Sequence, residues 1–307
     1  MKIGIIGAGA LGCYYGAKLA RGGHRVGFIA RGATLQALRT RGVCVRRDAE
    51  QFAVTDLQAT DQAREVGPVD LVLVATKSYD LKSIAPALRM LKGPETIVLP
   101  LQNGVDIAEQ LGALTEPAHI LGGLTYLPVS TVEPGVVRQT GEEKPMLLGP
   151  LRAADQPAAD AALGALCQAG IAAEIPADIR VALWMKFLLA VCTMGVQSVC
   201  GRPIGPTRED PDTRALYTAC MREVAAVAAR TGVVLPDDAQ EQMMTAIDAY
   251  PANVKASMLQ DLEHGRPLEL DAMHGTVVRL GEALGVATPV NRFIYAALKL
   301  RAGHSIS

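Results

Sequence analysis

The chain has 307 residues, of which 50% are hydrophobic and only 4% aromatic, and its formal net charge at pH 7 is −1. This length suffices for two globular domains with aliphatic cores. A nearly neutral chain without a long basic run gives no electrostatic support for a nucleic-acid partner or for binding to an anionic membrane.

A strand followed by a glycine-rich turn opens the chain. The apolar run Ile3–Ile6 leads into a Gly-x-Gly-x-x-Gly motif, and a helical stripe of apolar residues follows it. In such a motif the glycines allow the tight turn, the approach of a pyrophosphate and the close packing of the helix on the strand. We therefore predict that a dinucleotide is bound by Gly7, Ala8, Gly9, Ala10, Leu11 and Gly12.

The residue after the second predicted strand, 25–29, bears on which dinucleotide is bound. Arg31 stands there, and no aspartate or glutamate is near it. An acidic residue at this point suits the ribose 2′-OH of NAD, whereas an arginine suits a 2′-phosphate. The sequence predicts NADPH as the cofactor, with a solvated loop arginine as the alternative.

Alternating strands and helices continue after Arg31. Strands are predicted at 70–75 and 96–99, with a helix at 81–91 between them. This alternation predicts a doubly wound, parallel α/β sheet of Rossmann type, with ligand groups just past the strand ends. Lys77 and Asn103 occupy such positions. Shorter strands that can pair antiparallel are expected near Ile120, at 135–139 and at 145–148.

The second half of the sequence predicts helices only. We place the boundary at Pro176, with a nucleotide-binding domain at 1–176 and a helical domain at 177–307. Asp210 is expected to cap a helix that ends at Gly232. Further helices are predicted at 236–250, 253–264, 271–284 and 289–300. The apolar stripe from Cys220 to Val227 fits either an internal core or the face of a homodimer.

The spacing of the cysteines and histidines indicates neither disulfide bonds nor a metal site. The six cysteines lack a Cys-x-x-Cys pair, which favours buried free thiols, and the five histidines lack ligand spacing, so no metal site is expected. The nucleotide-binding glycines argue against a signal peptide, and no apolar run is expected to reach transmembrane length. These features predict a cytoplasmic protein.

One lysine stands out in the helical half. Lys186 lies in the apolar stretch 183–189, where an ammonium group is costly unless it is paired or reaches a wet cleft. Glu269, a carboxylate between two leucines, is a candidate partner, and Asp271 could begin the helix after it. Ser257 adds a hydroxyl on another predicted helix. Snorkelling of a lone lysine to the surface is the alternative.

These residues together resemble the ketopantoate reductase family, the 2-dehydropantoate 2-reductases, along essentially the whole chain. The generic part of the resemblance is the glycine motif. The more specific parts are the Leu-Trp-x-Lys sequence that ends at Lys186, the Ser-Met-Leu-Gln-Asp sequence at 257–261, and Glu269 twelve residues after Ser257.

The resemblance implies a Rossmann domain, a helical domain like that of 6-phosphogluconate dehydrogenase, and NADPH-dependent reduction of a 2-oxo acid, first of all ketopantoate to pantoate. It implies that Lys186 is the catalytic lysine and that Asn103 contacts cofactor and substrate. It further implies that Lys77 and Glu269 bind the cofactor or orient the substrate, and that Ser257 contacts the substrate.

The chain departs from the family pattern where asparagines hold the substrate. Ala190, Met194 and Ile204 replace three asparagines, and Leu268 replaces a threonine. An apolar wall favours apolar substituents and discriminates weakly. A more apolar 2-oxo acid is therefore an alternative substrate. The sequence also leaves open a non-catalytic NADP(H)-binding module and a dehydrogenase that acts on a 3-hydroxy acid or a polyol phosphate.

Overall fold

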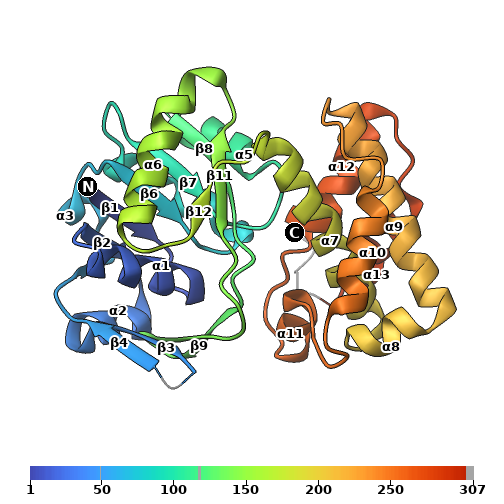
Figure 1. The fold of residues 1–307 in the computed structure, drawn as a ribbon, viewed down its shortest axis with the longest axis horizontal. Coiled ribbons are helices and arrows are strands. Elements are labelled where there is room, and N and C mark those ends of the chain that lie inside the picture. The colour runs from blue at the N-terminus through green and yellow to red at the C-terminus, as the bar shows by residue number, and fades with distance from the viewer. Residues whose placement is uncertain (49, 117–118, 302–307) are drawn as a thin grey trace. The chain divides into compact units, whose positions relative to one another are not determined.

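The computed structural model describes residues 1–48, 50–116 and 119–301, and its chain forms two compact units (Figure 1). We call Met1–Gln102 together with Asp106–Ile179 the sheet unit, and Asn103–Val105 together with the chain from Arg180 onward the helical unit. The two ranges expected from the sequence, 1–176 and 177–307, are contiguous, so they do not assign residues 103–105 to the helical unit.

The core of the sheet unit is an eight-stranded sheet in the order β12-β11-β8-β7-β6-β1-β2-β5. Its centre is parallel, since β1 pairs in parallel with both β2 and β6, and β6 pairs in parallel with β7. The central strands are apolar and buried, as expected of a sheet covered on both faces. The strands of this sheet are β1 (Lys2–Ile6), β2 (Arg25–Ile29), β5 (Gln58–Thr60), β6 (Leu71–Val74), β7 (Ile97–Pro100), β8 (His119–Leu124), β11 (Met146–Pro150) and β12 (Ala173–Glu174).

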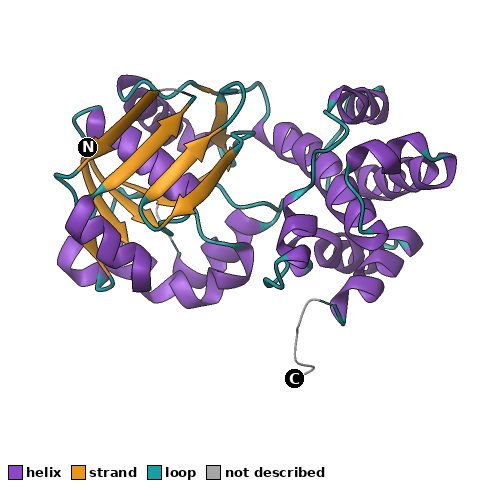
Figure 2. Cartoon of the chain, turned by 90° about the horizontal axis from the view of Figure 1, so that it is seen from below, coloured by secondary structure: helices purple, strands orange, loops and turns teal. Residues whose placement is uncertain are grey.

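Helices cover both faces of this sheet (Figure 2), so the doubly wound Rossmann-type fold predicted from the sequence is confirmed. Gly22 and the left-handed Gly23, with φ 87°, end the first helix where expected. The helices of the unit are α1 (Ala10–Arg21), α2 (Gly32–Arg41), α3 (Ala63–Val66), η1 (Ser78–Asp80), α4 (Leu81–Leu91), α5 (Ile107–Thr115), η2 (Ala153–Asp155) and α6 (Gln156–Gln168).

The later strands pair in both senses. β8 continues the parallel sheet beside β7 and pairs antiparallel with β11. A second sheet has the order β4-β3-β10-β9 and packs on α1. Three of its strands, β3 (Val43–Arg47), β4 (Glu50–Val54) and β9 (Val129–Glu133), were not predicted. β4 and β9 are mostly exposed and bury too few side chains to give a clear strand pattern. The fourth strand is β10 (Val136–Gln139), which the sequence predicted at 135–139.

The described part of the helical unit contains no strand, as the sequence predicted. Asp210 caps its helix by accepting a hydrogen bond from the Thr213 backbone N–H. The stripe from Cys220 to Val227 is buried inside this unit, so it forms internal core rather than an exposed dimer face. The helices are α7 (Ile179–Cys200), α8 (Ile204–Glu209), α9 (Pro211–Arg230), α10 (Ala239–Ala249), α11 (Ser257–Glu263), η3 (Asp271–Gly275), α12 (Thr276–Leu284) and α13 (Pro289–Lys299).

The 22-residue helix α7 corrects one expectation. Its most apolar window has a mean hydropathy of 1.7, so by length and composition it could cross a membrane. More than half of that window, 56%, is buried inside the protein, and the core helix of a soluble protein has the same properties. The expectation that no apolar run reaches this length was wrong, because Lys186 is the one charged residue between Val181 and Cys200.

One smaller expectation also fails, and another is confirmed only in part. Asp271 does not cap a helix from outside. It lies within the π-helical turn η3, and its carboxylate accepts a hydrogen bond from the Tyr295 hydroxyl at 2.7 Å. The cysteines are all free, but only Cys13, Cys192 and Cys220 are buried, and Cys167 is exposed.

Candidate functional site

The glycine loop between β1 and α1 owes its shape to close backbone packing. Gly7 has φ 97°, and a Cβ atom there would lie 2.6 Å from the Thr76 backbone nitrogen. A Cβ atom on Gly12 would lie 1.9 Å from the Gly7 carbonyl oxygen. Neither position has room for a side chain, so the loop is held against the end of β6.

Gly9 is the opposite case, since a Cβ atom there would meet nothing within 4 Å. Gly9 is also the N-cap of α1, and no side chain caps this helix end. The first-turn N–H groups and the positive end of the helix dipole are therefore available to an anion. Ala8, Ala10 and Leu11 pack against the core and hold the loop in place. The loop fits the pyrophosphate of a dinucleotide.

Arg31 is exposed at the point where β2 ends and α2 begins. It is the N-cap residue of α2, and the first turn of this helix carries no acidic residue. A guanidinium group in this place suits a doubly charged phosphate better than a neutral ribose hydroxyl.

Lys77 follows the carboxyl end of β6, the strand that pairs with β1. It is partly buried and is the N-cap residue of the single turn η1. Sequence reasoning missed the residues beside it. The Gln102 side-chain amide donates to the Thr76 hydroxyl at 3.2 Å, which ties the ends of β7 and β6 together. The one sequence feature that could have pointed to Thr76 and Gln102 is that each directly precedes a candidate residue, Lys77 or Asn103.

Asn103 belongs to the helical unit, although it follows a strand of the sheet unit. Gly104, with φ 128°, permits a turn directly after Asn103. The Asn103 amide lies 3.5 Å from the Glu269 carboxylate, at the limit for a hydrogen bond. The structure thus brings together two candidate residues that are 166 positions apart in the sequence.

Lys186 lies on α7 and is partly buried. Its neighbours Trp184 and Phe187 are buried, with their rings edge to face at 5.6 Å. Burial lowers the pKa of the Lys186 ammonium from 10.5 to about 8, and the nearby negative charge of Glu269 opposes this shift. The helical unit therefore contains a group of three candidate residues, Lys186, Glu269 and Asn103.

The segment that carries Glu269 is fixed by its apolar neighbours. Leu268 and Leu270 are buried in the core of the helical unit, and Glu269 itself is 7% exposed. The π-helical turn η3 follows at once, with the Met273 N–H donating to the Glu269 carbonyl oxygen. Single π-helical turns recur at functional sites.

A buried polar network supports this turn, and the sequence did not reveal it. The Nδ1 atom of His274 lies 2.8 Å from the Asn291 amide oxygen, and the Asn291 amide donates to Glu223 at 2.8 Å. Gly195 on α7 makes room for the imidazole, because a Cβ atom there would lie 2.2 Å from the His274 Nε2 atom. Burial lowers the pKa of His274 to about 4, so the ring is neutral. The network joins η3 to α7, α9 and α13.

Ser257 is the first residue of α11 and is exposed. The Gln197 side chain, on α7, accepts a hydrogen bond from the Ala256 backbone N–H at 2.8 Å and so fixes the start of α11. Within the described residues, no hydrogen bond joins Ser257 to the Lys186 group. Asp261, on the same helix, pairs with Arg266 at 2.8 Å.

Two family models together match most of the chain. Residues 3–153 match the model described as "Ketopantoate reductase PanE/ApbA", and residues 178–302 match "Ketopantoate reductase PanE/ApbA C terminal". The chain belongs to the ketopantoate reductase family. It is an oxidoreductase of a class that uses a nicotinamide cofactor.

Similar proteins cover nearly the whole chain. The 2-dehydropantoate 2-reductase of Mesorhizobium japonicum is 30% identical, with 97% of each chain covered. That of Mycobacterium tuberculosis is 32% identical, with 94% of each chain covered. The crystal structure of a PanE/ApbA family ketopantoate reductase from Ralstonia eutropha is 32% identical, with a TM-score of 0.90 and 98% of each chain covered.

The four apolar residues that replace polar ones of the ketopantoate reductase pattern also have apolar surroundings. Met194, Ile204 and Leu268 are buried in the same hydrophobic core as Trp184, and Ala190 packs against it. Within the described residues, no group of three or more histidine, cysteine, aspartate or glutamate side chains is arranged to hold a metal ion.

Proposed function

We propose that this member of the ketopantoate reductase family reduces a 2-oxo acid to the 2-hydroxy acid with NADPH, and that ketopantoate is the first candidate substrate. The observation that carries this proposal is the partly buried lysine with a lowered pKa beside a carboxylate, in the helical unit. A protein that only binds a nucleotide has no need of such a pair.

The sheet unit supplies the groups that would hold the cofactor. The first-turn N–H groups of α1 would bind the pyrophosphate past Gly9, and Arg31 would bind the 2′-phosphate. Lys77 would add a positive charge at the end of β6. NADPH, when bound, supplies the hydride. These residues favour NADPH over NADH, because no acidic side chain in the first turn of α2 is placed to accept from a ribose 2′-OH.

Lys186 would supply the proton. As the carbonyl carbon is reduced, its oxygen gains negative charge, and an ammonium group at hydrogen-bond distance stabilises that charge and then transfers a proton from Nζ to the oxygen. With a pKa of about 8, Lys186 is mostly protonated at neutral pH and is a stronger acid than an ordinary lysine. Glu269 holds the ammonium form, and Asn103 orients the Glu269 carboxylate.

A more apolar 2-oxo acid is the second candidate substrate. A site that hydrogen-bonds a substrate hydroxyl with amide side chains rejects analogues that lack it, whereas an apolar wall does not. Ala190, Met194, Ile204 and Leu268 provide no such amide or hydroxyl. Ketopantoate remains first because the named relatives are 2-dehydropantoate 2-reductases.

We also infer a cytoplasmic location. The one helix that is long and apolar enough to cross a membrane, among the described residues, is largely packed in the core of the helical unit. The partners of this protein in the cell would be small molecules, its cofactor and its substrate.

The test is consumption of NADPH with a panel of 2-oxo acids that includes ketopantoate and bulky apolar acids. We expect turnover by the wild type, and a loss in kcat of at least ~100-fold in Lys186→Ala with NADPH binding retained. Lys299→Ala, which removes an exposed lysine of the same unit, should leave kcat unchanged. Turnover on no acid, or near-normal turnover by Lys186→Ala, would reject the proposal.

A further inference from the structure

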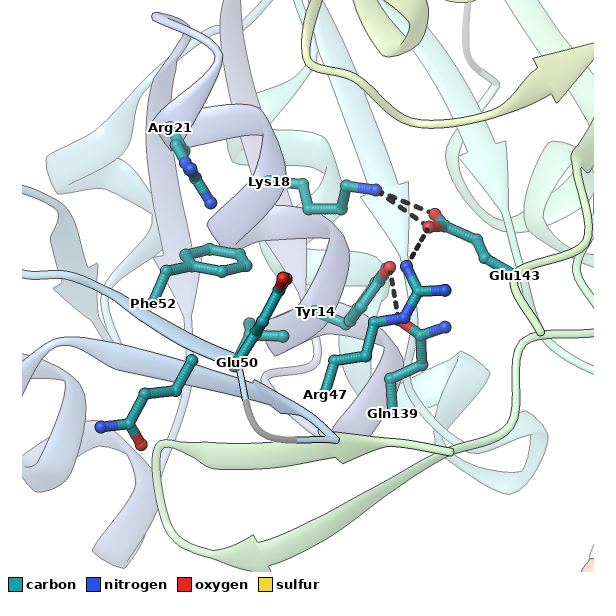
Figure 3. Close-up of a pocket in the computed structure, with 10 residues that line it drawn as sticks. Tyr14, Lys18, Arg21, Arg47, Glu50, Phe52, Gln139 and Glu143 are labelled. Carbon is teal, nitrogen blue, oxygen red and sulfur yellow. Dashed lines mark hydrogen bonds and ion pairs between the residues drawn. The ribbon is translucent and has the colours of Figure 1, made fainter. Parts of the chain in front are cut away.

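A cavity of about 580 Å³ lies in the sheet unit, on the side of α1 that faces the second, four-stranded sheet (Figure 3). We call it the Arg47 cavity. Its volume falls within the range of small-molecule binding sites. The residues that line it are Tyr14, Lys18, Arg21, Val45, Arg47, Glu50, Gln51, Phe52, Gln139 and Glu143.

Regular structure brings these side chains together. Tyr14, Lys18 and Arg21 are spaced by four and three residues, so they share one face of α1. Val45 and Arg47 are two apart on β3 and share a face of the sheet, and Phe52 on β4 lies directly opposite Val45. Because helix and strands fix these positions, the cavity is a built feature of the fold and not a gap between loops.

The floor of the cavity is polar and already ordered. The buried Tyr14 hydroxyl donates to the Gln139 side-chain oxygen at 3.1 Å, and the Gln139 amide in turn donates to the Gly141 carbonyl oxygen at 3.3 Å. Burial and the Glu143 carboxylate raise the pKa of Tyr14, so its phenol stays neutral. None of these groups takes part in the proposed reductase site.

The charges on the walls favour an anion. Three cations, Lys18, Arg21 and Arg47, face two carboxylates. Glu143 is shared by two of these cations, since it lies 2.9 Å from the Lys18 ammonium and 4.0 Å from the Arg47 guanidinium. At that second distance Arg47 keeps donors for another partner, and its side chain is 48% exposed and able to turn.

Arg21 brings a positive charge and an aromatic ring together in one wall of the cavity. Its guanidinium lies over the Phe52 ring, 4.7 Å from the ring centre, and in the part of the chain that the structure describes it forms no ion pair with a carboxylate. The positive charge of Arg21 would repel a cation that entered the cavity and would attract an anion. Phe52 and the buried Val45 add an apolar surface beside the cations.

We propose that the Arg47 cavity is a binding site for a small organic anion, a phosphate or carboxylate joined to a flat apolar group. Arg47 and Arg21 bind the anionic group, and the apolar group lies against Phe52 and Val45. Lys18 remains paired with Glu143. The site differs from the cofactor loop, because Lys18 lies eight residues, roughly 12 Å, along α1 from Ala10 at the helix start.

The experiment is calorimetric titration of the NADPH-loaded protein with phenyl phosphate, so that the cofactor already occupies Arg31. Inorganic phosphate provides the charge without the ring, and benzylamine provides the ring with the opposite charge. We expect saturable binding of phenyl phosphate, weaker binding of inorganic phosphate and no binding of benzylamine.

Two variants locate the site. Binding should weaken at least ~10-fold in the double variant Arg21→Gln, Arg47→Gln, and should be retained in the control Arg64→Gln, an exposed arginine on α3 outside the cavity. Arg47→Lys, which keeps the charge, should bind better than Arg47→Gln. An absence of saturable binding to the wild type, equal binding by the double variant, or a preference for benzylamine would overturn the proposal. The readout is binding, so failure would leave the reductase proposal untouched.

Discussion

The two units carry candidate residues of different physical kinds. The sheet unit offers mainly backbone, a glycine loop without room for side chains at Gly7 and Gly12 and an uncapped helix end, together with the exposed side chain of Arg31. The helical unit offers charged side chains held in an apolar core, where burial shifts the pKa values of Lys186 and His274 downward. Affinity for a phosphate can therefore rest on local geometry, whereas a lysine with a lowered pKa requires residues distant in the sequence to pack around it.

The largest effect should come from the glycine loop. In Gly12→Ala the new methyl group would overlap the Gly7 carbonyl oxygen, which is backbone and cannot yield, so we expect a loss of several kcal/mol, about 3 or more, in the stability of the sheet unit. Gly9→Ala has open space around it and should unfold at the same temperature as the wild type, with weaker NADPH binding. Thermal unfolding and fluorescence titration measure the two effects.

Equal stability of Gly12→Ala and Gly9→Ala would contradict this prediction, because it would mean that the close approach of Gly12 to the Gly7 carbonyl oxygen does not affect the free energy of unfolding.

The next effect concerns acid stability of the helical unit. His274 has a pKa of about 4 in the folded protein and an ordinary pKa near 6.5 when unfolded. The unfolded state therefore binds a proton first, and stability present above pH 6.5 is lost as the pH falls towards 4, by on the order of 3 kcal/mol. Urea unfolding between pH 4 and 7 measures this slope.

His274→Gln should flatten that slope whatever it does to stability at neutral pH. His264→Gln is the matched control, because His264 is exposed on the same unit, and it should keep the wild-type slope. If the slope of His274→Gln equals that of the wild type, the imidazole is not buried in its neutral form.

A smaller effect is expected at Arg31. Arg31→Ala should lower the preference for NADPH over NADH about tenfold, since one charge-assisted contact to a 2′-phosphate is lost, and should leave kcat with saturating NADPH nearly unchanged. Steady-state kinetics with both cofactors measure the ratio. An unchanged ratio of kcat/KM would remove Arg31 from the cofactor site.

The same contrast explains which features the sequence could predict. The Rossmann strands, the glycine loop and the cap at Asp210 depend on residues a few positions apart, and local patterns predicted them. The edge strands β4 and β9 are mostly exposed and bury too few side chains to give a clear strand pattern, so they were missed. The π-helical turn was also missed, since residues 271–284 were predicted as one helix.

The candidate site divides in the same way. Lys186 and Glu269 were identifiable as unusual charges among apolar neighbours, and the resemblance to a family supplied their roles. The meeting of Asn103 with Glu269, and the support that His274 receives from Asn291 and Glu223, depend on tertiary packing that no local spacing encodes.

The central claim, that Lys186, with the charge of Glu269 near it, is the proton donor, is tested most directly by the pH dependence of single-turnover hydride transfer from NADPH to the best 2-oxo acid of the panel. We predict that the rate falls above a pH of about 8, and that Glu269→Gln moves this fall to lower pH, because Glu269 raises the Lys186 pKa. A rate that stays constant through that range, or a fall that Glu269→Gln leaves in place, would contradict the claim.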